Sequence, residues 1–344
     1  MAAEINAGQY SKVFSLSHTD PYTTIDGVSR TVSATWRSIS QFTTSSSDFE
    51  TETGTLGLDY SWPLTEFQSV RMGIAAQRSD LFTDPNSSAA EALYWVQNNG
   101  NTYTEVQNVG IPPIALTYYG TRFDTFEYSL GWSYDSRNRA LFADRGSRHR
   151  LSASYALPFS DIDFVSFNYD YLQFIPVSKW FTLMFNSEAG YGQALGDTTS
   201  MPPYRRFFAG GPETVRGYRE SRMGPKDSFG NPYGGNIKFT NQLELLLPMP
   251  AKWRNSARFS LFFDIGNVFS NDDVAYVGRD GVTPVDYEFS FDKLRYSTGV
   301  AVQWMAPLGV FRFSYAVPLN EFKGNAVEYP DETEGFQFSI GQAF

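Results

Sequence analysis

No cysteine occurs among the 344 residues, and histidine occurs only as His18 and His149. The absence of cysteine excludes disulfide frameworks and thiol chemistry, and two histidines are too few for a His-rich metal site. Most enzyme classes thereby lose their usual catalytic groups, so we expect no enzymatic activity, no metal and no cofactor. Both histidines are interpreted as solvated surface residues.

Long apolar runs are missing as well. A membrane-spanning helix needs about 20 consecutive apolar residues, and the densest apolar stretch, 243–249, is interrupted by Glu244 and Pro248. This excludes helical membrane proteins. Because 42% of the residues are hydrophobic and 17% aromatic at a mean hydropathy of −0.33, the apolar residues must be dispersed along the chain.

Clustered positive charge is also absent, and the formal net charge is −10. A nucleic-acid backbone is held by clustered Lys and Arg side chains. Nucleic acid is therefore excluded as a partner.

The sequence does contain alternation with a period of two. Apolar residues alternate with small or polar ones over about ten positions, and then a turn-rich segment follows, as expected for β-strands. In the segment 126–135, a strand would separate the two sets onto opposite faces. One face would carry Phe126, Tyr128, Leu130, Trp132 and Tyr134, and the other Glu127, Ser129, Gly131, Ser133 and Asp135.

The apolar faces are rich in Tyr, Trp and Phe near the strand ends. A soluble β-sandwich also alternates, but its apolar faces tend to be aliphatic. Apolar-out, polar-in strands of about ten residues with interfacial aromatics are typical of transmembrane barrels, and only a closed sheet satisfies its backbone groups in lipid. The predicted fold is all-β, a single transmembrane antiparallel β-barrel domain over 1–344 with about 13 strands, or about 14 with a stub at 3–8. The predicted strands lie near 9–20, 28–42, 50–63, 68–81, 123–137, 148–158, 164–176, 180–193, 236–248, 257–269, 294–306, 309–318 and 335–344.

The predicted connections alternate between two kinds. The short ones carry Pro21, Pro63, Pro176, Pro248 and Pro307. Because bacterial barrels have short periplasmic turns and longer extracellular loops, the proline-bearing set is expected to face the periplasm. The two longest connections, 82–122 and 196–235, are predicted to be irregular extracellular loops.

The second long loop contains a compact motif. Its residues are Gly210, Gly211, Val215, Arg216, Gly217 and Tyr218, followed by Met223-Gly224-Pro225-Lys226. An apolar-Arg-Gly-aromatic sequence between glycines indicates a tight, ordered turn that presents one guanidinium.

If the loop folds into the lumen, Arg216 needs an acidic partner, and two carboxylates lie on inward faces by parity. Glu244 alternates with outward leucines, and Asp264 alternates with outward Phe263 and Ile265. A planar guanidinium binds carboxylates bidentately, so Glu244 and Asp264 could both converge on Arg216. The alternative interpretation is that all three are ordinary solvated lumen charges.

At this point a resemblance becomes specific. The glycine pair followed by Val-Arg-Gly-Tyr resembles the loop signature of the superfamily that contains the BamA family and the two-partner-secretion transporters. The similarity covers about 9–344 and continues in Leu243-Glu244 before Pro248, in 262–266 (Phe-Phe-Asp-Ile-Gly), in 303–309 (Gln-Trp-Met-Ala-Pro-Leu-Gly), in 313–316 (Phe-Ser-Tyr-Ala) and in 336–341 (Phe-Gln-Phe-Ser-Ile-Gly). The 223–226 and 303–309 segments resemble BamA rather than the transporters.

The resemblance implies an integral protein of the bacterial outer membrane that folds and inserts other β-barrels. Its partners would be the lipid bilayer, nascent β-barrel clients and assembly-complex lipoproteins. It also implies that the loop is tucked into the barrel with Arg216 locked to Glu244 and Asp264, and that the first and last strands form a lateral seam whose edge templates the client.

The sequence departs from the family in two ways. Family barrels have about sixteen strands, so the first two and most of the third are expected to be missing here. The periplasmic POTRA domains that precede the barrel in the family are not found either. We therefore interpret the chain as a fragment.

The predicted terminal strand carries Phe336, Phe338 and Ile340 on its outward face, then Gly341 and the final Phe344. An aromatic terminus resembles the sorting signal of outer-membrane barrels, and it would also serve as an interfacial aromatic. Gly341 is a candidate kink or edge-weakening position, because a strand glycine often marks a bend; simple packing is the alternative.

Other functional classes remain open on the sequence. A two-partner secretion transporter, which exports a protein through the pore, shares the Val-Arg-Gly-Tyr motif. A passive porin fits the alternation but not the loop motif. An outer-membrane enzyme would need a Ser-His or Asp-His pair, which the two histidines do not suggest.

Overall fold

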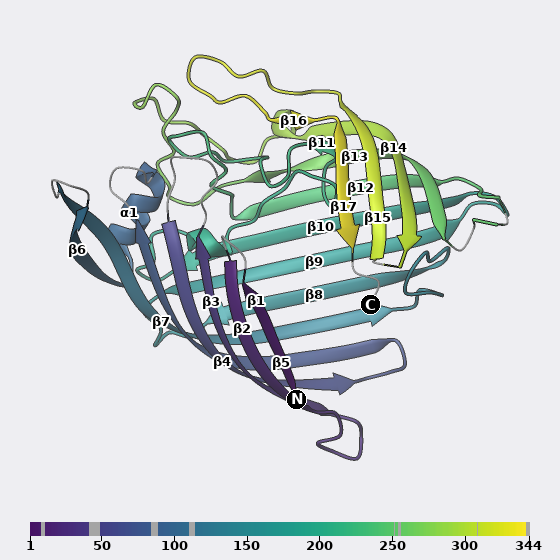
Figure 1. The fold of residues 1–344 in the computed structure, drawn as a ribbon, viewed down its shortest axis with the longest axis horizontal. Coiled ribbons are helices and arrows are strands. Elements are labelled where there is room, and N and C mark those ends of the chain that lie inside the picture. Colours follow the sequence, from purple (N-terminus) through teal and green to yellow (C-terminus); the bar gives the residue numbers. More distant parts are fainter. Residues whose placement is uncertain are drawn as a thin grey trace.

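The computed structural model describes residues 1–7, 11–40, 49–83, 89–109, 114–250, 252–253, 256–307 and 309–341. Within them, one long antiparallel sheet meanders from the N-terminus to the C-terminus, and each strand pairs with the next strand of the path (Figure 1). The strands of this path are β1 (Ala2–Ala7), β2 (Ser11–Asp20), β3 (Ser29–Ser40), β4 (Phe49–Pro63), β5 (Gln68–Thr83), β7 (Ile114–Asp135), β8 (Gly146–Ala156), β9 (Asp163–Pro176), β10 (Thr182–Leu195), β12 (Ile237–Leu246), β13 (Ala257–Phe269), β14 (Arg295–Ala306), β15 (Gly309–Pro318) and β17 (Phe336–Gly341).

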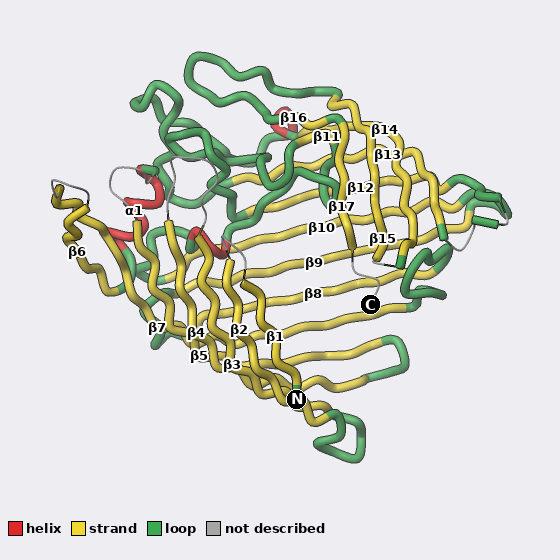
Figure 2. Tube along the Cα trace, in the orientation of Figure 1, coloured by secondary structure: helices red, strands yellow, loops and turns green. Residues whose placement is uncertain are grey.

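The sheet curls so that its two edge strands, β1 and β17, approach the same side of the molecule (Figure 2). The described residues show no ladder between β1 and β17. Every strand predicted from the alternation is present, and the stub at 3–8 is confirmed as β1, which pairs with β2. The antiparallel, all-β prediction is confirmed.

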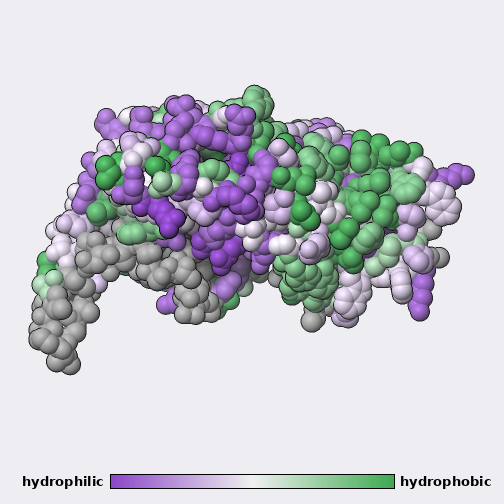
Figure 3. Space-filling model, turned by 90° about the horizontal axis from the view of Figure 1, so that it is seen from above, coloured by the Kyte–Doolittle hydropathy of each residue, from purple (hydrophilic) through white to green (hydrophobic). Residues whose placement is uncertain are grey.

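The two faces of the sheet reverse the burial pattern of a soluble protein. On the outward face Leu56 is 66% exposed and Ile74 56%, whereas on the inward face Glu244 is 3% exposed and Asp264 0%. Apolar side chains cover the right half of the molecule in Figure 3, and hydrophilic ones cover the left half, where the loops lie. This is the pattern of a sheet whose outside meets hydrocarbon. No helix among the described residues is long and apolar enough to cross a membrane.

The prediction that 82–122 is an irregular loop is wrong for its described part. The segment contains the helix α1 (Ala90–Asn98) and the strand β6 (Asn101–Val109), which pairs only with β7. It also contains the first residues of β7 itself, 114–122. In this extension Tyr119 packs against the apolar core under the loops, while Arg122 points outward. Because its apolar residues point inward, the apolar-out rule used to find the strands does not detect it.

The connections sort onto two ends of the sheet. All five proline-bearing connections lie at one end, because strands alternate in direction along the path. The loop 196–236, with the 3₁₀ turn η1 (Pro203–Arg205) and the short strand β11 (Gly217–Tyr218), lies at the other end. So do 270–294, with the turn η2 (Phe291–Lys293), and 319–335, with β16 (Thr333–Glu334). An apolar core lies under these loops, where Trp95, Phe123, Ile162, Phe164 and Met201 pack together.

Candidate functional site: the loop anchored to the inner wall

The loop after β10 folds back on itself at residues 210–218, here called the loop tip. The backbone N–H of Gly210 donates to Thr214 Oγ1 at 2.9 Å, and that of Gly211 donates to the Tyr218 carbonyl at 2.9 Å. Gly210 has φ of +104°, and a Cβ there would lie 2.3 Å from the Arg219 carbonyl oxygen. Only glycine therefore fits at this position.

Arg216 projects from the loop tip onto the inner wall. Its Nε donates to Asp264 Oδ2 at 2.7 Å and its Nη2 to Asp264 Oδ1 at 2.7 Å, while its Nη1 donates to Glu244 Oε1 at 2.5 Å. The backbone N–H of Arg216 also donates to Asp264 Oδ2 at 3.0 Å. The structure thus brings together Arg216, Glu244 and Asp264, here called the anchor triad, which strand parity allowed and the family resemblance implied.

The anchor triad is shielded from water. Arg216 is 4% exposed, and its guanidinium carbon lies 3.6 Å from the ring centroid of Phe262 on β13. Burial disfavours the charged guanidinium, but the hydrogen bonds to Asp264 and the charge of Glu244 outweigh this, so the pKa of Arg216 is raised. Arg216 is therefore a permanent cation, and removing one partner of such a buried pair costs about 3–5 kcal/mol.

The neighbours of Arg216 fix the turn by packing. Val215 and Tyr218 are both fully buried and contact Met223 and Val268 in a small apolar cluster. Gly217 has φ of +87°, and a Cβ there would lie 3.1 Å from Ala316 Cβ on β15. The motif residues therefore hold a close approach between the loop tip and the strand wall.

Gln337 on β17 is a site residue that the motif search missed. Its Oε1 accepts from the Gly217 backbone N–H at 3.1 Å, and its Nε2 donates to the Tyr218 carbonyl at 2.7 Å. Gln337 is 3% exposed, and the neighbouring β16 pairs with β11. One side-chain amide thus ties the terminal strand to the loop tip. Its inward parity was readable from the sequence, but its partners are backbone groups, which leave no sequence signal.

A second, more exposed contact joins the loop tip to the same two strands. The Arg312 Nη1 of β15 donates to both carboxylate oxygens of Glu213, at 2.6 and 2.5 Å, and Ser339 Oγ of β17 donates to Glu213 Oε1 at 3.3 Å. Exposed ion pairs contribute little. The buried contacts of Arg216 and Gln337 therefore dominate the attachment.

The predicted terminal-strand residues lie where parity placed them. Phe336, Phe338 and Ile340 are exposed on the outward face of β17, and Gly341 pairs with Val310 at the end of the ladder. Gly341 is the last described residue of β17, so the kink predicted there stays a prediction. Phe344 lies outside the described residues.

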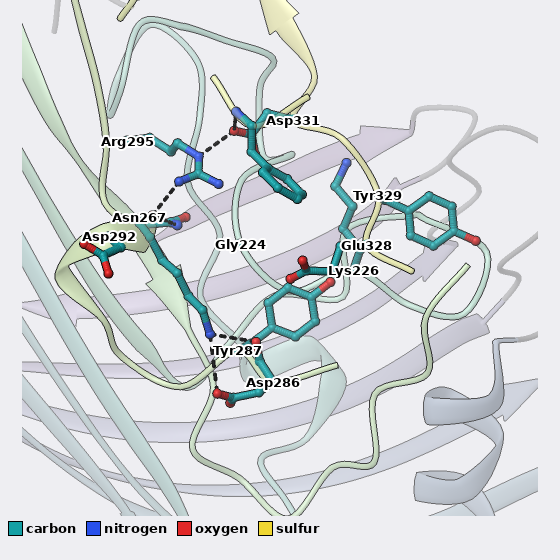
Figure 4. A pocket seen from close by; sticks show the side chains of 12 residues that line it. Gly224, Lys226, Asn267, Asp286, Tyr287, Asp292, Arg295, Glu328, Tyr329 and Asp331 are labelled. Atoms are coloured by element: carbon teal, nitrogen blue, oxygen red, sulfur yellow. Dashed lines mark hydrogen bonds and ion pairs between the residues drawn. The ribbon is translucent and has the colours of Figure 1, made fainter. Parts of the chain in front are cut away.

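Beyond the loop tip, the loop 196–236 meets the loops 270–294 and 319–335 around a pocket of about 270 Å³ (Figure 4). Lys226 Nζ donates to the Pro330 carbonyl at 2.8 Å and lies 3.4 Å from Glu332 Oε1, while Arg295 Nε donates to Asp331 Oδ2 at 2.5 Å. Burial lowers the pKa of Lys226. These contacts hold the three loops together as one cap.

The cap contains further buried polar residues that the sequence did not reveal. Arg206 and Asp272 form an ion pair at 3.0 Å, and Arg206 also donates to the Tyr276 hydroxyl at 3.0 Å. Glu91 of α1 accepts from the backbone N–H groups of Ser228 and Val277 at 3.1 and 3.2 Å. Each contact joins segments that are remote in sequence, so these residues could be predicted only if the path of the loops were known.

The two histidines take no part in the anchor. His18 lies in β2, and His149 lies on the outward face of β8, close to the first residue of that strand. Its Nδ1 is 2.8 Å from the Tyr169 hydroxyl, and the rings of Trp132, Tyr134 and Tyr171 surround it. It belongs to an aromatic belt near the end of the sheet that carries the short turns.

Comparison with known proteins identifies relatives that are similar to this chain in both sequence and fold. The Omp85 superfamily domain matches residues 1–344. The outer membrane protein assembly factor BamA of Neisseria meningitidis serogroup B is 34% identical over 348 residues, covering 96% of this chain and 41% of that protein. The sorting assembly machinery 50 kDa subunit of Saccharomyces cerevisiae is 24% identical over 46% of this chain and 31% of its own length.

Among solved structures, BamA from Haemophilus ducreyi lacking POTRA domains 1–3 superposes with a TM-score of 0.79 at 25% identity, covering 96% of this chain and 61% of that one. CdiB from Acinetobacter baumannii, at 12% identity and a TM-score of 0.51, shares the fold alone over 96% of this chain and 50% of that one. The chain thus spans less than half the length of the Neisseria relative. It belongs to the Omp85 superfamily.

Proposed function

We propose that this chain is the membrane barrel of an assembly insertase, which folds and inserts β-barrel proteins into the bacterial outer membrane. The observation that carries the proposal is the loop tip fixed inside the sheet by Arg216, Glu244 and Asp264. It occurs in a chain that is 34% identical to an outer membrane protein assembly factor.

The anchor triad gives the loop a mechanical role. Through Glu244 it holds β12, through Asp264 β13, and through Gln337 the terminal strand β17. A single loop tip thus contacts the edge strand β17 and two strands further into the sheet, β12 and β13. We propose that it keeps this edge in the form that accepts a client.

The chemistry of insertion is backbone pairing. An unpaired strand edge is a ready surface for adding another strand. Each backbone hydrogen bond that a client makes there avoids an unsatisfied group in lipid, which costs several kcal/mol. Client folding can therefore supply the driving free energy without a nucleotide or a catalytic residue, so the protein would not be an enzyme.

The partners follow from this role. They are the outer-membrane bilayer on the apolar face and unfolded β-barrel clients at the strand edge. Assembly-complex lipoproteins would bind the whole protein. Passive conduction is less favoured, because the anchored loop tip lies against the inner wall. Secretion through the lumen is less favoured, because the 34% identical relative is an assembly factor.

The test replaces Arg216 with Gln in the gene of the bacterium that encodes the chain. Arg216→Gln should lower the amount of folded barrel proteins in the outer membrane and abolish the heat-resistant form of the protein on gels. Arg78→Gln is the matched control, since the Arg78–Asp124 pair at 2.6 Å lies on the outward face and is exposed. Unchanged client levels in Arg216→Gln would refute the proposal.

A further inference from the structure

One of the two histidines lies among four aromatic rings on the outward face of the sheet. His149 of β8 pairs with Tyr134 of β7 on one side and with Tyr171 of β9 on the other. The ring centroids of Tyr171, Tyr134, Trp132 and Tyr169 lie 4.6, 5.6, 6.0 and 6.2 Å from that of the imidazole. We call these five side chains the belt cluster.

The histidine and one tyrosine of the belt cluster share a single hydrogen bond. His149 Nδ1 lies 2.8 Å from the Tyr169 hydroxyl. If the hydroxyl donates to Nδ1, the proton on Nε2 is left to donate elsewhere, and if Nδ1 donates, the hydroxyl proton is left instead. Either tautomer therefore leaves one outward donor that has no partner among the described residues.

Two further donors belong to the belt cluster. Within the part of the chain that the structure describes, neither Trp132 Nε1 nor the Tyr134 hydroxyl has a hydrogen-bond partner. The Tyr171 hydroxyl differs, since it donates to Gln173 Oε1 at 3.2 Å. The belt cluster contains no carboxylate that could accept the remaining protons, and an unsatisfied polar group in lipid costs several kcal/mol. We therefore expect the acceptor to come from the surrounding membrane.

The belt cluster lies at the depth of the lipid headgroups. His149 comes three residues after Gly146, the first residue of β8, at the end of the sheet that carries the short turns. A rise of about 3.4 Å per residue and a tilt of about 40° place the histidine about 8 Å below that end. The polar headgroup layer is roughly 5–7 Å thick on each side of the hydrocarbon core. Leu151, two residues further along the same face, is 43% exposed and continues that face into hydrocarbon.

We propose that the belt cluster binds the phosphate of one phospholipid headgroup, through the free donor of the His149–Tyr169 pair and the donors beside it. A phosphodiester oxygen is an ionised acceptor, and hydrogen bonds to ionised groups are roughly twice as strong as those between neutral groups. The ester carbonyls of the same lipid are neutral, so the phosphate is the stronger ligand. The inference goes beyond the proposed function, because it requires only that the outward face meets lipid.

The place of the belt cluster in the sheet gives the site a role. β8 is the seventh of the 14 strands of the path, so the belt cluster lies far from both edge strands. A bound headgroup there holds the middle of the sheet at one level in the membrane and touches neither β1 nor β17. The site therefore positions the barrel without covering a strand edge.

The test uses the fact that the chain has only two histidines. The purified chain, with isotope-labelled histidine in a maltoside detergent, is titrated with dioleoyl phosphatidylethanolamine while NMR follows both imidazoles, which His18→Gln and His149→Gln assign. The His149 signal should reach half of its shift at a lipid concentration at least tenfold below that for His18, which contacts no aromatic ring among the described residues. Dioleoylglycerol, which has the same acyl chains and esters but no phosphate, should not reproduce the shift.

Tyr169→Phe keeps the ring and removes the hydroxyl, and it should raise the half-shift concentration for His149 at least threefold. Tyr191→Phe is the matched control, because this outward tyrosine at the other end of the sheet donates to Gln193 Oε1 at 2.8 Å; it should change nothing. Both variants are accepted only with an unchanged heat-resistant gel band. Equal responses of the two histidines in the wild type, or an equal His149 shift with dioleoylglycerol, would overturn the proposal. The same shift with equimolar inorganic phosphate would also overturn it, since a plain oxyanion site needs no lipid.

Discussion

The inner faces of the two ends of the sheet differ in what holds them. On β2–β5 the inward contacts include hydroxyl pairs between neighbouring strands, such as Ser15 with Thr35 at 3.2 Å and Thr53 with Ser79 at 3.1 Å. The ion pair of Arg71 with Asp59 on this face is exposed, and Arg205 of the loop reaches only Gln77 of β5 in this region, at 3.3 Å. On β12–β17 the inward face carries a buried ion network that a loop crosses. The first region is held by its ladder, and the second is also clamped from inside.

This difference indicates that stability is distributed unevenly. Local opening in proteins starts where buried contacts are few. We expect strands β2–β4 to exchange their backbone hydrogens before β12–β15, because only the latter carry the anchor. Substitutions that remove the contacts of the anchor one at a time test this difference in stability.

The largest effect is expected from Asp264→Asn. This change keeps the shape of the side chain but leaves the buried guanidinium of Arg216 with Glu244 alone, at a cost of about 3–5 kcal/mol. The midpoint of the heat-resistant gel band should fall sharply. Glu188→Gln is the control, because the Glu188–Lys238 pair at 2.6 Å lies on the inner wall without touching the loop tip; an equal fall in both variants would contradict the anchor.

The anchor triad shows how far the sequence reaches. Parity on the strands that follow the loop placed Glu244 and Asp264 inward, but it left open whether they were solvated charges. Only the family resemblance implied that they hold Arg216. The extension of β7 at 114–122 was missed because Tyr119 packs inward there, against the apolar-out rule that holds within the bilayer. The contacts of Glu91 and Arg206 could not be predicted from the sequence, because the alternation of apolar and polar residues does not show which path a loop takes.

A smaller effect is expected from Gln337→Leu. It leaves the Gly217 N–H and the Tyr218 carbonyl without partners, and an unsatisfied buried group costs about 1–3 kcal/mol. Hydrogen exchange at Gly217 should accelerate while the Arg216 contacts persist. Gln303→Leu, on the inner face of β14, which β15 separates from β17, should leave that exchange unchanged. Acceleration in both variants would assign the effect to general loosening.

Gly217→Ala should cost about 1–2 kcal/mol, because an L-residue in the left-handed region is strained and its Cβ would press on Ala316. The matched variant is Gly54→Ala in β4, where a Cβ meets no atom within 4 Å. Thermal unfolding should separate the two variants. Equal midpoints would mean that the loop tip tolerates a side chain and does not sit close to β15.

The smallest effect concerns pH. Burial alone would raise the pKa of Glu332, but Lys226 and Arg222 outweigh it, so the pKa lies below its ordinary value of 4.5. The ionised Glu332 carboxylate therefore stabilises the folded loops. Its contribution is fully present above about pH 4.5 and is lost as the pH falls through the folded-state pKa. At pH 7 the loops of Glu332→Gln should be less stable than those of the wild type by about 1 kcal/mol or less, and limited proteolysis should cleave them faster. At low pH the two proteins should be cleaved at the same rate. A difference that persists at low pH would exclude the ionised carboxylate as its cause.

The most direct measurement compares hydrogen exchange in the two regions, with and without the anchor. In the wild-type chain, the amides of β12 and β13 should be markedly more protected than those of β3 and β4. In Arg216→Gln, protection should fall in β12 and β13 and stay unchanged in β3 and β4. Equal protection of both regions in the wild type, or no change on substitution, would contradict the claim that Arg216 clamps β12 and β13 from inside.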